Sequence, residues 1–217
     1  VLTTSVTSSY DGVRLGVGGG EGGEAGIAGT IALMADVALN SAFPENELQR
    51  LKKSRLAAIA QEKAQPMGMV MRTLPPLLFG EKHAYGTPLT GSGTPEAVEK
   101  LTVADLKKWR DTWLRPNNAI LLVVGDTTMA ELKPLVEKQF KSWRKAKQFP
   151  AVPKPTVELP AEQKVYLLDR PDAVQTMVIA GHLAPARNND SEIPLRTMNS
   201  LLGGMFTSRL NMNLRED

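Results

Sequence analysis

The sequence predicts an α+β fold, in which helices pack on a mixed β-sheet. Two observations predict this class. Segments that alternate β-branched and polar residues open the chain and return near its end, and apolar residues at helical spacing fill much of the region between them. The predicted order is strands, several helices, one strand and a helix, and then a linker followed by new strands and helices. Such mixing excludes a β-sandwich and a helical bundle.

The first forty residues predict a hairpin, a flexible connection and a helix. Residues 1–10 and 12–18 alternate as strands do, with a turn at Asp11-Gly12. The glycine-rich stretch GVGGGEGGEAG follows. A phosphate-binding or dinucleotide-binding loop is the alternative for this stretch, but the Lys-Ser/Thr pair of a P-loop and a clear βαβ unit are missing. Apolar residues then recur at helical spacing and predict a helix that ends near Asn40.

The next segments predict two helices. One begins at Pro44, where the early acids Glu45 and Glu47 suit the positive end of a helix dipole. The second, MVMRTLPPLLFG, is expected to be shorter because Pro75-Pro76 interrupts it. The turn-forming residues of EKHAYGTPLTGSGTP then predict a loop.

A capped helix, a buried strand and another helix are expected between residues 100 and 147. Thr102 is the expected N-cap, with Asp105 three residues later in a capping box. The apolar run 119–124 lies between turn signals and predicts a buried strand. One apolar stripe, ending at Phe140 and Trp143, predicts the helix that follows.

The last third begins with an extended linker. Residues 148–162 contain four prolines, which favour an extended chain. KVYLLDRPDAVQTMVIAGHL then predicts two strands. SEIPLRTMNSLLGG predicts a helix that ends at Gly203-Gly204, and the final residues open one more helix.

Composition excludes several classes of partner. Lys and Arg exceed Asp and Glu by only 26 to 23 and are scattered, and aromatic residues make up 5% of the chain. We therefore expect no nucleic-acid partner. Cysteine is absent, so disulfides and thiolate metal sites are excluded. The longest apolar run is too short to cross a bilayer, and we expect no membrane partner.

Several long segments together resemble the pitrilysin/insulinase (M16) family of zinc peptidases, which includes the mitochondrial processing peptidase. They cover most of the chain in the family's order, and the chain resembles a non-catalytic portion of a bacterial zinc protease. The matching segments are AFPENELQRLKKSRLAA, HAYGTPLTG, LTVADLKKWRDTWLRPNNAILLVVGDTT and DAVQTMVIAGHLAPARNNDSEIPLRTMNSLLGGMFTSRLNMNLRED.

The resemblance implies a domain organisation. Family members are built of homologous half-units, each a mixed sheet with helices, joined by an extended linker. Residues 1–147 would be the later part of one half-unit, residues 148–162 the linker, and residues 163–217 the beginning of the next. The chain is then expected to be a piece of a longer protein, with a periplasmic or other cell-envelope location.

The same resemblance implies that this part of the protein holds no metal. The family's zinc motif is His-x-x-Glu-His on a helix, with a downstream glutamate as the third ligand. His83 and His182 are the only histidines, and neither lies in such a motif. The glutamates of the family's downstream helix fall on Leu51 and Ala58, whose side chains cannot bind zinc. Glu62, one turn beyond Ala58, is the alternative carboxylate. Zinc is expected in the parent protein or a partner.

Arg215 is the one candidate site residue. In family members, a pattern similar to SSRLxxxLRexxGLxY supplies an Arg and a Tyr that orient the substrate peptide, from a half-unit other than the zinc-bearing one. The match places that Arg at Arg215, while the Tyr would lie past Asp217. The alternative is a solvated Arg near a frayed end. For His83 and His182 we expect local anchoring, with a pH or substrate role as the alternative for His83.

The sequence leaves three candidate functions for this chain. The first is a non-catalytic part of a zinc metalloendopeptidase-like protein, which walls a substrate chamber and supplies Arg215 to a peptide site elsewhere. The second is a structural or assembly homologue without a role in proteolysis, and the third is a small-molecule module that uses the glycine-rich loop. Whether the intact protein is an enzyme stays open, but we expect this chain alone to be inactive. Its expected partners are another half-unit or subunit of the family, or a second copy in a homodimer.

Overall fold

The computed structural model describes residues 2–9, 12–19, 26–152, 156–158, 162–171 and 175–215. The chain divides into two compact units, which are described separately below. The first contains Val1–Glu158 and Leu167–Ile179, and the second contains Leu159–Tyr166 and Ala180–Asp217.

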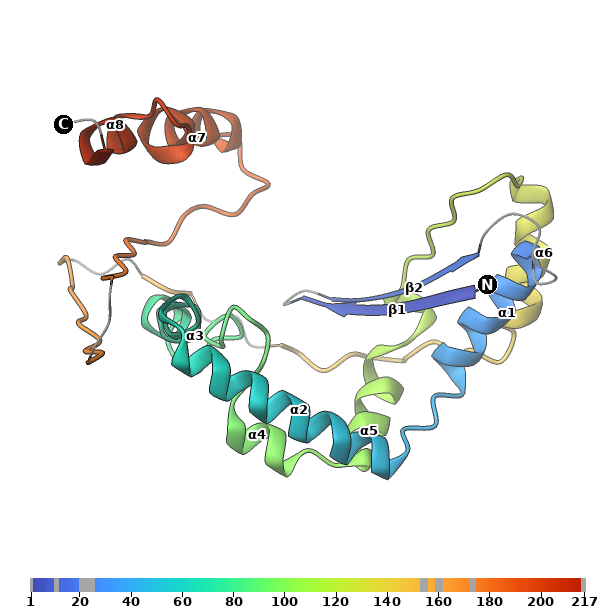
Figure 1. The fold of residues 1–217 in the computed structure, drawn as a ribbon. Helices are drawn as coiled ribbons and strands as arrows, with labels where there is room; N and C mark the ends of the chain where they lie inside the picture. The colour runs from blue at the N-terminus through green and yellow to red at the C-terminus, as the bar shows by residue number, and fades with distance from the viewer. Residues whose placement is uncertain are drawn as a thin grey trace. The chain divides into compact units, whose positions relative to one another are not determined.

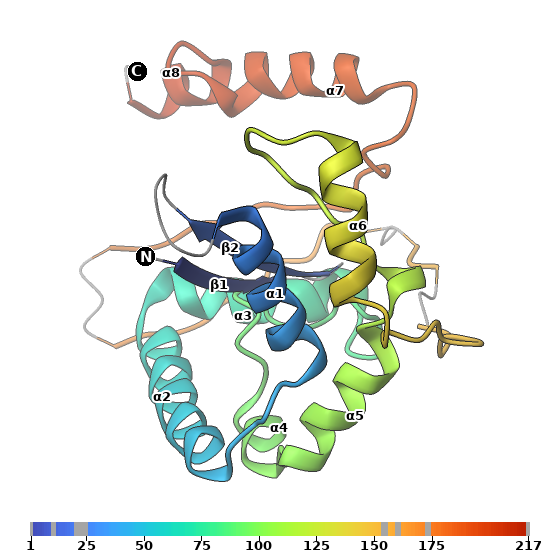
Figure 2. The same cartoon turned by 90° about the vertical axis from the view of Figure 1, so that its right-hand side faces the viewer.

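The first unit opens with the predicted hairpin and helix. Strands β1 (Leu2–Ser8) and β2 (Val13–Gly19) pair antiparallel. Helix α1 (Gly26–Leu39) lies against β2, as Figure 2 shows. It buries a small apolar stripe, as the helical spacing predicted. The stripe consists of Ile31, Ala35 and Ala38. The turn residue Asp11 and the glycine-rich residues 20–25 lie outside the described part of the chain.

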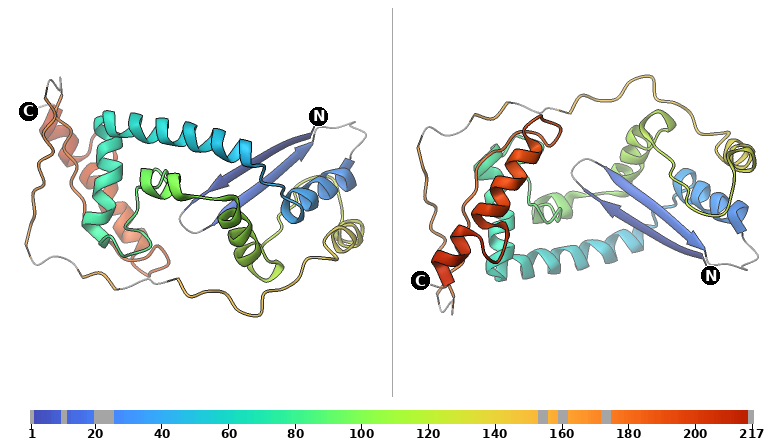
Figure 3. Two further views of the ribbon diagram at one scale, coloured as in Figure 1. Left: turned by 90° about the horizontal axis from the view of Figure 1, so that it is seen from below. Right: turned by 90° about the horizontal axis from the view of Figure 1, so that it is seen from above.

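Helices α2 (Glu45–Ala64) and α3 (Pro66–Phe79) form the corner of this unit (Figures 1 and 3). Leu48 and Ile59 are the buried apolar residues of α2. A short helix, α4 (Pro95–Lys100), which the sequence analysis did not anticipate, packs against α2. The Nζ of Lys52 donates to the carbonyl oxygens of Glu99 and Leu101 at 2.6 and 3.0 Å. A lysine of α2 thus satisfies carbonyls at the end of α4, where a cation is favourable.

The predicted interruption of α3 is wrong, because the helix continues through Pro75-Pro76. A proline inside a helix lacks the N–H that would bond the carbonyl four residues earlier. For Pro75 that carbonyl belongs to Met71, and it accepts instead from the N–H of Leu89 at 2.8 Å. The loop after α3 therefore uses the carbonyl that the proline leaves unpaired.

The rest of the first unit contains α5 (Val103–Trp113), the 3₁₀ turn η1 (Pro116–Asn118) and α6 (Met129–Gln139). The predicted capping box of α5 is confirmed: the Oγ1 of Thr102 accepts from the N–H of Asp105, whose carboxylate accepts from the N–H of Thr102. The predicted helical stripe through Trp143 is wrong at its end, because α6 ends at Gln139. Trp143 lies beyond the helix, and its Nε1 donates to the carbonyl of Leu114 at 3.0 Å.

The sheet is smaller than the sequence predicts. Within the described residues, β1 and β2 form the only strand pair. The strand predicted at residues 119–124 and the two predicted within 164–182 do not form in the described chain. The predicted burial of 119–124 is wrong, because all six residues are exposed. The structure therefore supports a helix-rich fold with a two-stranded sheet, and the larger mixed sheet stays a prediction.

The second unit ends in a helical segment. Helix α7 (Glu192–Asn199) runs into η2 (Ser200–Gly204), a π-helical turn, and α8 (Arg209–Arg215) follows. The turn η2 contacts both helices, which lie at the red end of the chain in Figure 1. The predicted helix ending at Gly203-Gly204 and the final helix are confirmed. Among the described helices, none combines the length and apolar character needed to span a bilayer. The boundaries of the predicted half-units stay a prediction.

Candidate functional site

The candidate metal face lies on the solvent side of α2. Leu51 and Ala58 are both exposed, and their spacing of two helical turns places them on one side of the helix. This side offers an isobutyl and a methyl group where a zinc ligand would be needed. Hydrocarbon groups donate no electron pair to a dication. The geometry of α2 therefore does not form a zinc site at these positions.

Glu62, the alternative carboxylate, is held by a cluster of polar groups. Its Oε2 lies 2.8 Å from Nη1 of Arg72 in α3 and accepts from the Oγ of Ser92 at 2.7 Å and the Oγ1 of Thr90 at 3.1 Å. Arg72 also donates to the Oγ of Ser92 at 2.6 Å and to the carbonyl of Gly93 at 2.7 Å. The cluster joins α2, α3 and the loop before α4.

The electrostatics of this cluster favour an ionised Glu62. Partial burial alone would raise the pKa of the carboxyl, but hydrogen bonds from Ser92, Arg72 and Thr90, with the positive charge of Arg72, outweigh it and lower the pKa. The side chains of Arg72 and Glu62 are only 9% and 21% exposed. The carboxylate is therefore neutralised by a guanidinium, which makes it a structural anchor and a poor metal ligand.

Metal-ligating residues do not gather elsewhere in the described chain. Across the residues that the structure places, no three His, Cys, Asp or Glu side chains lie close enough together to hold an ion. The residues that the structure describes therefore do not offer a ligand set that fits a bound zinc.

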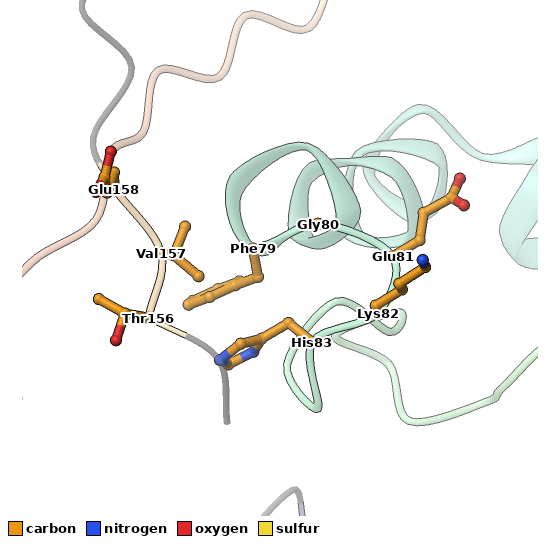
Figure 4. Close-up of a pocket in the computed structure, with 8 residues that line it drawn as sticks. All are labelled: Phe79, Gly80, Glu81, Lys82, His83, Thr156, Val157 and Glu158. Atoms are coloured by element: carbon orange, nitrogen blue, oxygen red, sulfur yellow. The ribbon is translucent and has the colours of Figure 1, made fainter. Parts of the chain in front are cut away.

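His83 lies beside a surface cavity of about 520 Å³. Figure 4 shows Phe79 and His83 pointing toward Val157 of the linker, while Glu81 and Lys82 point away. The imidazole stacks on Phe79 with ring centroids 5.2 Å apart, and its Nδ1 accepts from the N–H of Tyr85 at 3.0 Å. With Nδ1 occupied, the neutral ring carries its proton on Nε2. The buried ring thus has the predicted loop-anchoring role, and the cavity offers mainly ring faces and apolar groups.

His182 and Arg215 lie in the second unit and also make local contacts. The Nδ1 of His182 is 2.5 Å from the carbonyl of Leu183, which confirms the predicted local hydrogen bond, although the strand expected before it does not form. Arg215 is exposed on the last described turn of α8, and its Cζ lies 5.3 Å from the ring centroid of Phe206. This is a cation–π contact between two exposed residues of the same unit.

Comparison with known proteins decides the family. Residues 100–217, more than half of the chain, match the family described as "Peptidase M16 inactive domain". The chain belongs to the M16 peptidase family. This confirms the predicted membership and the predicted match to its non-catalytic portion.

Curated M16-like relatives are zinc proteases by name. An uncharacterized zinc protease of Mycobacterium leprae is 27% identical over 186 residues, covering 86% of this chain and 41% of the relative. The uncharacterized zinc protease YmxG of Bacillus subtilis is 26% identical over 185 residues, covering 85% and 43%. The zinc protease PqqE of Helicobacter pylori is 27% identical over 135 residues, covering 61% and 30%. The chain thus spans about two fifths of the length of the first two relatives.

A solved structure shares the fold. The crystal structure of a protease from Helicobacter pylori aligns with 98% of this chain and 50% of its own, with a TM-score of 0.63 and 22% identity. At this identity the match shows a shared fold alone, and the chain spans half the length of that protein.

The sequence analysis missed the partners of Glu62. Arg72, Thr90 and Ser92 are 10 to 30 residues away along the chain. These separations are longer than the few residues over which helical or strand spacing relates side chains, so no local sequence pattern predicts the cluster. The M16 resemblance drew attention to Glu62 as an alternative ligand, and only the tertiary structure shows that Arg72 neutralises it.

Proposed function

We propose that this chain is a non-catalytic part of a zinc metalloendopeptidase-like protein. In this role it forms part of the wall around a substrate chamber, and Arg215 contacts the peptide at a site whose zinc is bound elsewhere. The observation that carries the proposal is the match of residues 100–217 to the inactive domain of a peptidase family. The apolar face of α2 at Leu51 and Ala58 and the neutralised Glu62 support a role without metal.

The chemistry of Arg215 suits a substrate-orienting residue. A guanidinium stays charged at any physiological pH and donates in a fixed planar fork, which matches peptide carbonyls and an oxyanion. Arg215 is exposed, and Phe206 covers one face of its guanidinium at 5.3 Å. The N–H groups at the guanidinium edge therefore stay available to a peptide while the aromatic ring limits rotation.

The cation–π contact also favours a second candidate function. If the stacking of Arg215 on Phe206 only stabilises the end of α8, the chain is a structural or assembly homologue of the family without a role in proteolysis. The two candidates differ in whether Arg215 affects peptide turnover in the intact protein.

The test is Arg215→Ala in the intact protein, with Arg209→Ala as the matched control on the same helix. If Arg215 stabilises the reacting peptide, kcat/KM falls by about 100-fold, as for loss of one donor to developing charge. Arg209→Ala keeps kcat/KM within about twofold.

Urea unfolding of both variants checks that neither is globally destabilised, because exposed substitutions usually change stability by within about 0.5 kcal/mol. Full activity of Arg215→Ala would exclude the substrate-orienting role and leave the structural candidate.

A further inference from the structure

Phe43 has a backbone conformation that its residue type avoids. Within the described residues it is the only non-glycine residue with a positive φ, at 50°. For a bulky side chain such a φ is an outlier, because the Cβ crowds the following carbonyl oxygen. Pro44 comes next, and a residue before proline favours an extended conformation with φ of about −120°. The local sequence therefore opposes this conformation, and contacts from elsewhere in the fold must stabilise it.

Arg110 of α5 supplies long-range contacts at this point. Its Nη1 donates to the carbonyl oxygen of Ser41 at 3.1 Å, and its Cζ lies 5.7 Å from the ring centroid of Phe43. A guanidinium can make both contacts at once, because its edge donates hydrogen bonds and its face stacks on a ring. The side chain of Arg110 is 21% exposed, so water screens these contacts only partly.

The strained residue lies between two groups of packed elements. Helix α1 packs on β2 and α6, whereas α2 packs on α3 and α4, and Figure 1 shows α5 beside the connection between α1 and α2. Both ends of this connection are anchored. The hydroxyl of Ser41 donates to the carbonyl of Val37 in α1, and the N–H of Leu48 in α2 donates to the carbonyl of Pro44. Two residues, one of them Phe43, lie between the anchored ends.

We propose that Phe43 is a strained joint between these two groups and that Arg110 is the latch that keeps the joint in its positive-φ conformation. When the contacts of Arg110 are lost, Phe43 changes from a φ of 50° to an extended φ of about −120°. Hinges of this kind absorb a large backbone rotation in one or two residues between rigid groups. The rotation turns α1, with β1, β2 and α6, relative to α2, α3 and α4. This joint is separate from Arg215 and does not depend on the function proposed above.

The experiment measures the distance between two spin labels, one in each group, by double electron–electron resonance on the 217-residue chain. The chain lacks cysteine, so Ala28→Cys in α1 and Ser54→Cys in α2 place the labels at two exposed positions. The latched chain is expected to show one distance. Arg110→Ala is expected to raise the share of a second distance by at least about tenfold, since the loss of a hydrogen bond to a charged group shifts an equilibrium by that much. Lys107→Ala, at an exposed position of the same helix, is the matched control and should keep the parent distribution.

A second variant tests the strain itself. Glycine adopts a positive φ without a steric penalty, so adding Phe43→Gly to Arg110→Ala is expected to reduce the share of the second distance. Arg110→Lys keeps the charge but lacks the planar fork, and it should show an intermediate share, which keeps the test decisive if Arg110→Ala does not fold. Circular dichroism identifies the variants that keep the helical signal of the parent.

Two results would overturn the proposal. If folded Arg110→Ala or Arg110→Lys keeps the single distance of the parent, Arg110 is a structural contact and not a latch. If the share of the second distance grows when Phe43→Gly is added to Arg110→Ala, the strain at Phe43 does not drive the rotation.

Discussion

Replacement of Arg72 by alanine tests the cluster that holds α2, α3 and the following loop together. Arg72 donates to the Oε2 of Glu62, to the Oγ of Ser92 and to the carbonyl of Gly93, at 2.8, 2.6 and 2.7 Å. The alanine variant removes all three bonds and leaves a carboxylate that keeps only two hydroxyl donors. We therefore expect Arg72→Ala to lower the free energy of unfolding by more than the loss of an exposed side chain usually does.

The magnitude follows from burial. Breaking a fully buried ion pair costs about 3–5 kcal/mol, and exposed pairs contribute at most about 1 kcal/mol. Arg72 is 9% exposed and Glu62 21% exposed, so water reaches the carboxylate only partly. We expect Arg72→Ala to lower the free energy of unfolding by about 2–3 kcal/mol. Arg72→Lys should recover only part of this, because an ammonium cannot match the planar fork.

The assay is urea unfolding at pH 7, with Arg50→Ala as the matched control. Arg50 pairs with Glu47 on the same helix at 2.8 Å, but these side chains are 66% and 47% exposed, so the control is expected to lose at most about 0.5 kcal/mol. The pKa of Glu62 lies below its ordinary value of 4.5, so its contribution is present above that pH and is lost as the pH falls through the lowered pKa. The difference between parent and Arg72→Ala should therefore shrink as the pH falls below 4.5 and through the lowered pKa of Glu62. Equal losses for Arg72→Ala and Arg50→Ala at pH 7 would refute the anchoring role.

Three further predictions concern the helix cap, the turn after α3 and the metal. Thr102→Ala should lower the free energy of unfolding by about 1 kcal/mol through loss of the capping box. Thr112→Ala is the control in the same urea assay and should leave this free energy nearly unchanged, because the Thr112 hydroxyl donates to the carbonyl of Lys108 within the same helix. Gly80 has φ of 82° and open space where a Cβ would lie, so Gly80→Ala should lower the free energy of unfolding by about 1–3 kcal/mol from backbone strain alone. Gly125→Ala is the control, because Gly125 has equal space and no such φ. Similar melting temperatures for the two variants would contradict this reasoning. The purified chain should retain no stoichiometric zinc after dialysis, because the α2 face carries Leu51 and Ala58, and one tightly held zinc per chain by metal analysis would show that a ligand set exists.

Local sequence signals predicted the helices well. The hairpin, α1, α2 and the capping box at Thr102 depend on residues within a few positions of each other, and spacing and capping rules capture such elements. The prediction for α3 was wrong because the fate of the Met71 carbonyl depends on Leu89, which lies outside any local window.

The extended segments show a different limit. The apolar run 119–124 was expected to form a buried strand, but it is exposed and forms no strand, because pairing and burial need neighbouring strands that the described chain does not provide. Local pattern indicates strand propensity, whereas pairing is a tertiary property. The candidate site divides in the same way: Leu51 and Ala58 were placed from sequence, while the neutralisation of Glu62 by Arg72 required the structure.

Peptide hydrolysis by this chain alone, compared with the intact protein, tests the central claim most directly. The account predicts zinc-dependent turnover of an unfolded peptide by the intact protein and none by the 217-residue chain, with or without added zinc. It also predicts that Leu51→Glu combined with Ala58→Glu leaves the chain inactive, since no pair of histidine ligands accompanies these positions. Zinc-dependent hydrolysis by the chain alone would contradict the claim that it is a non-catalytic part of the protein.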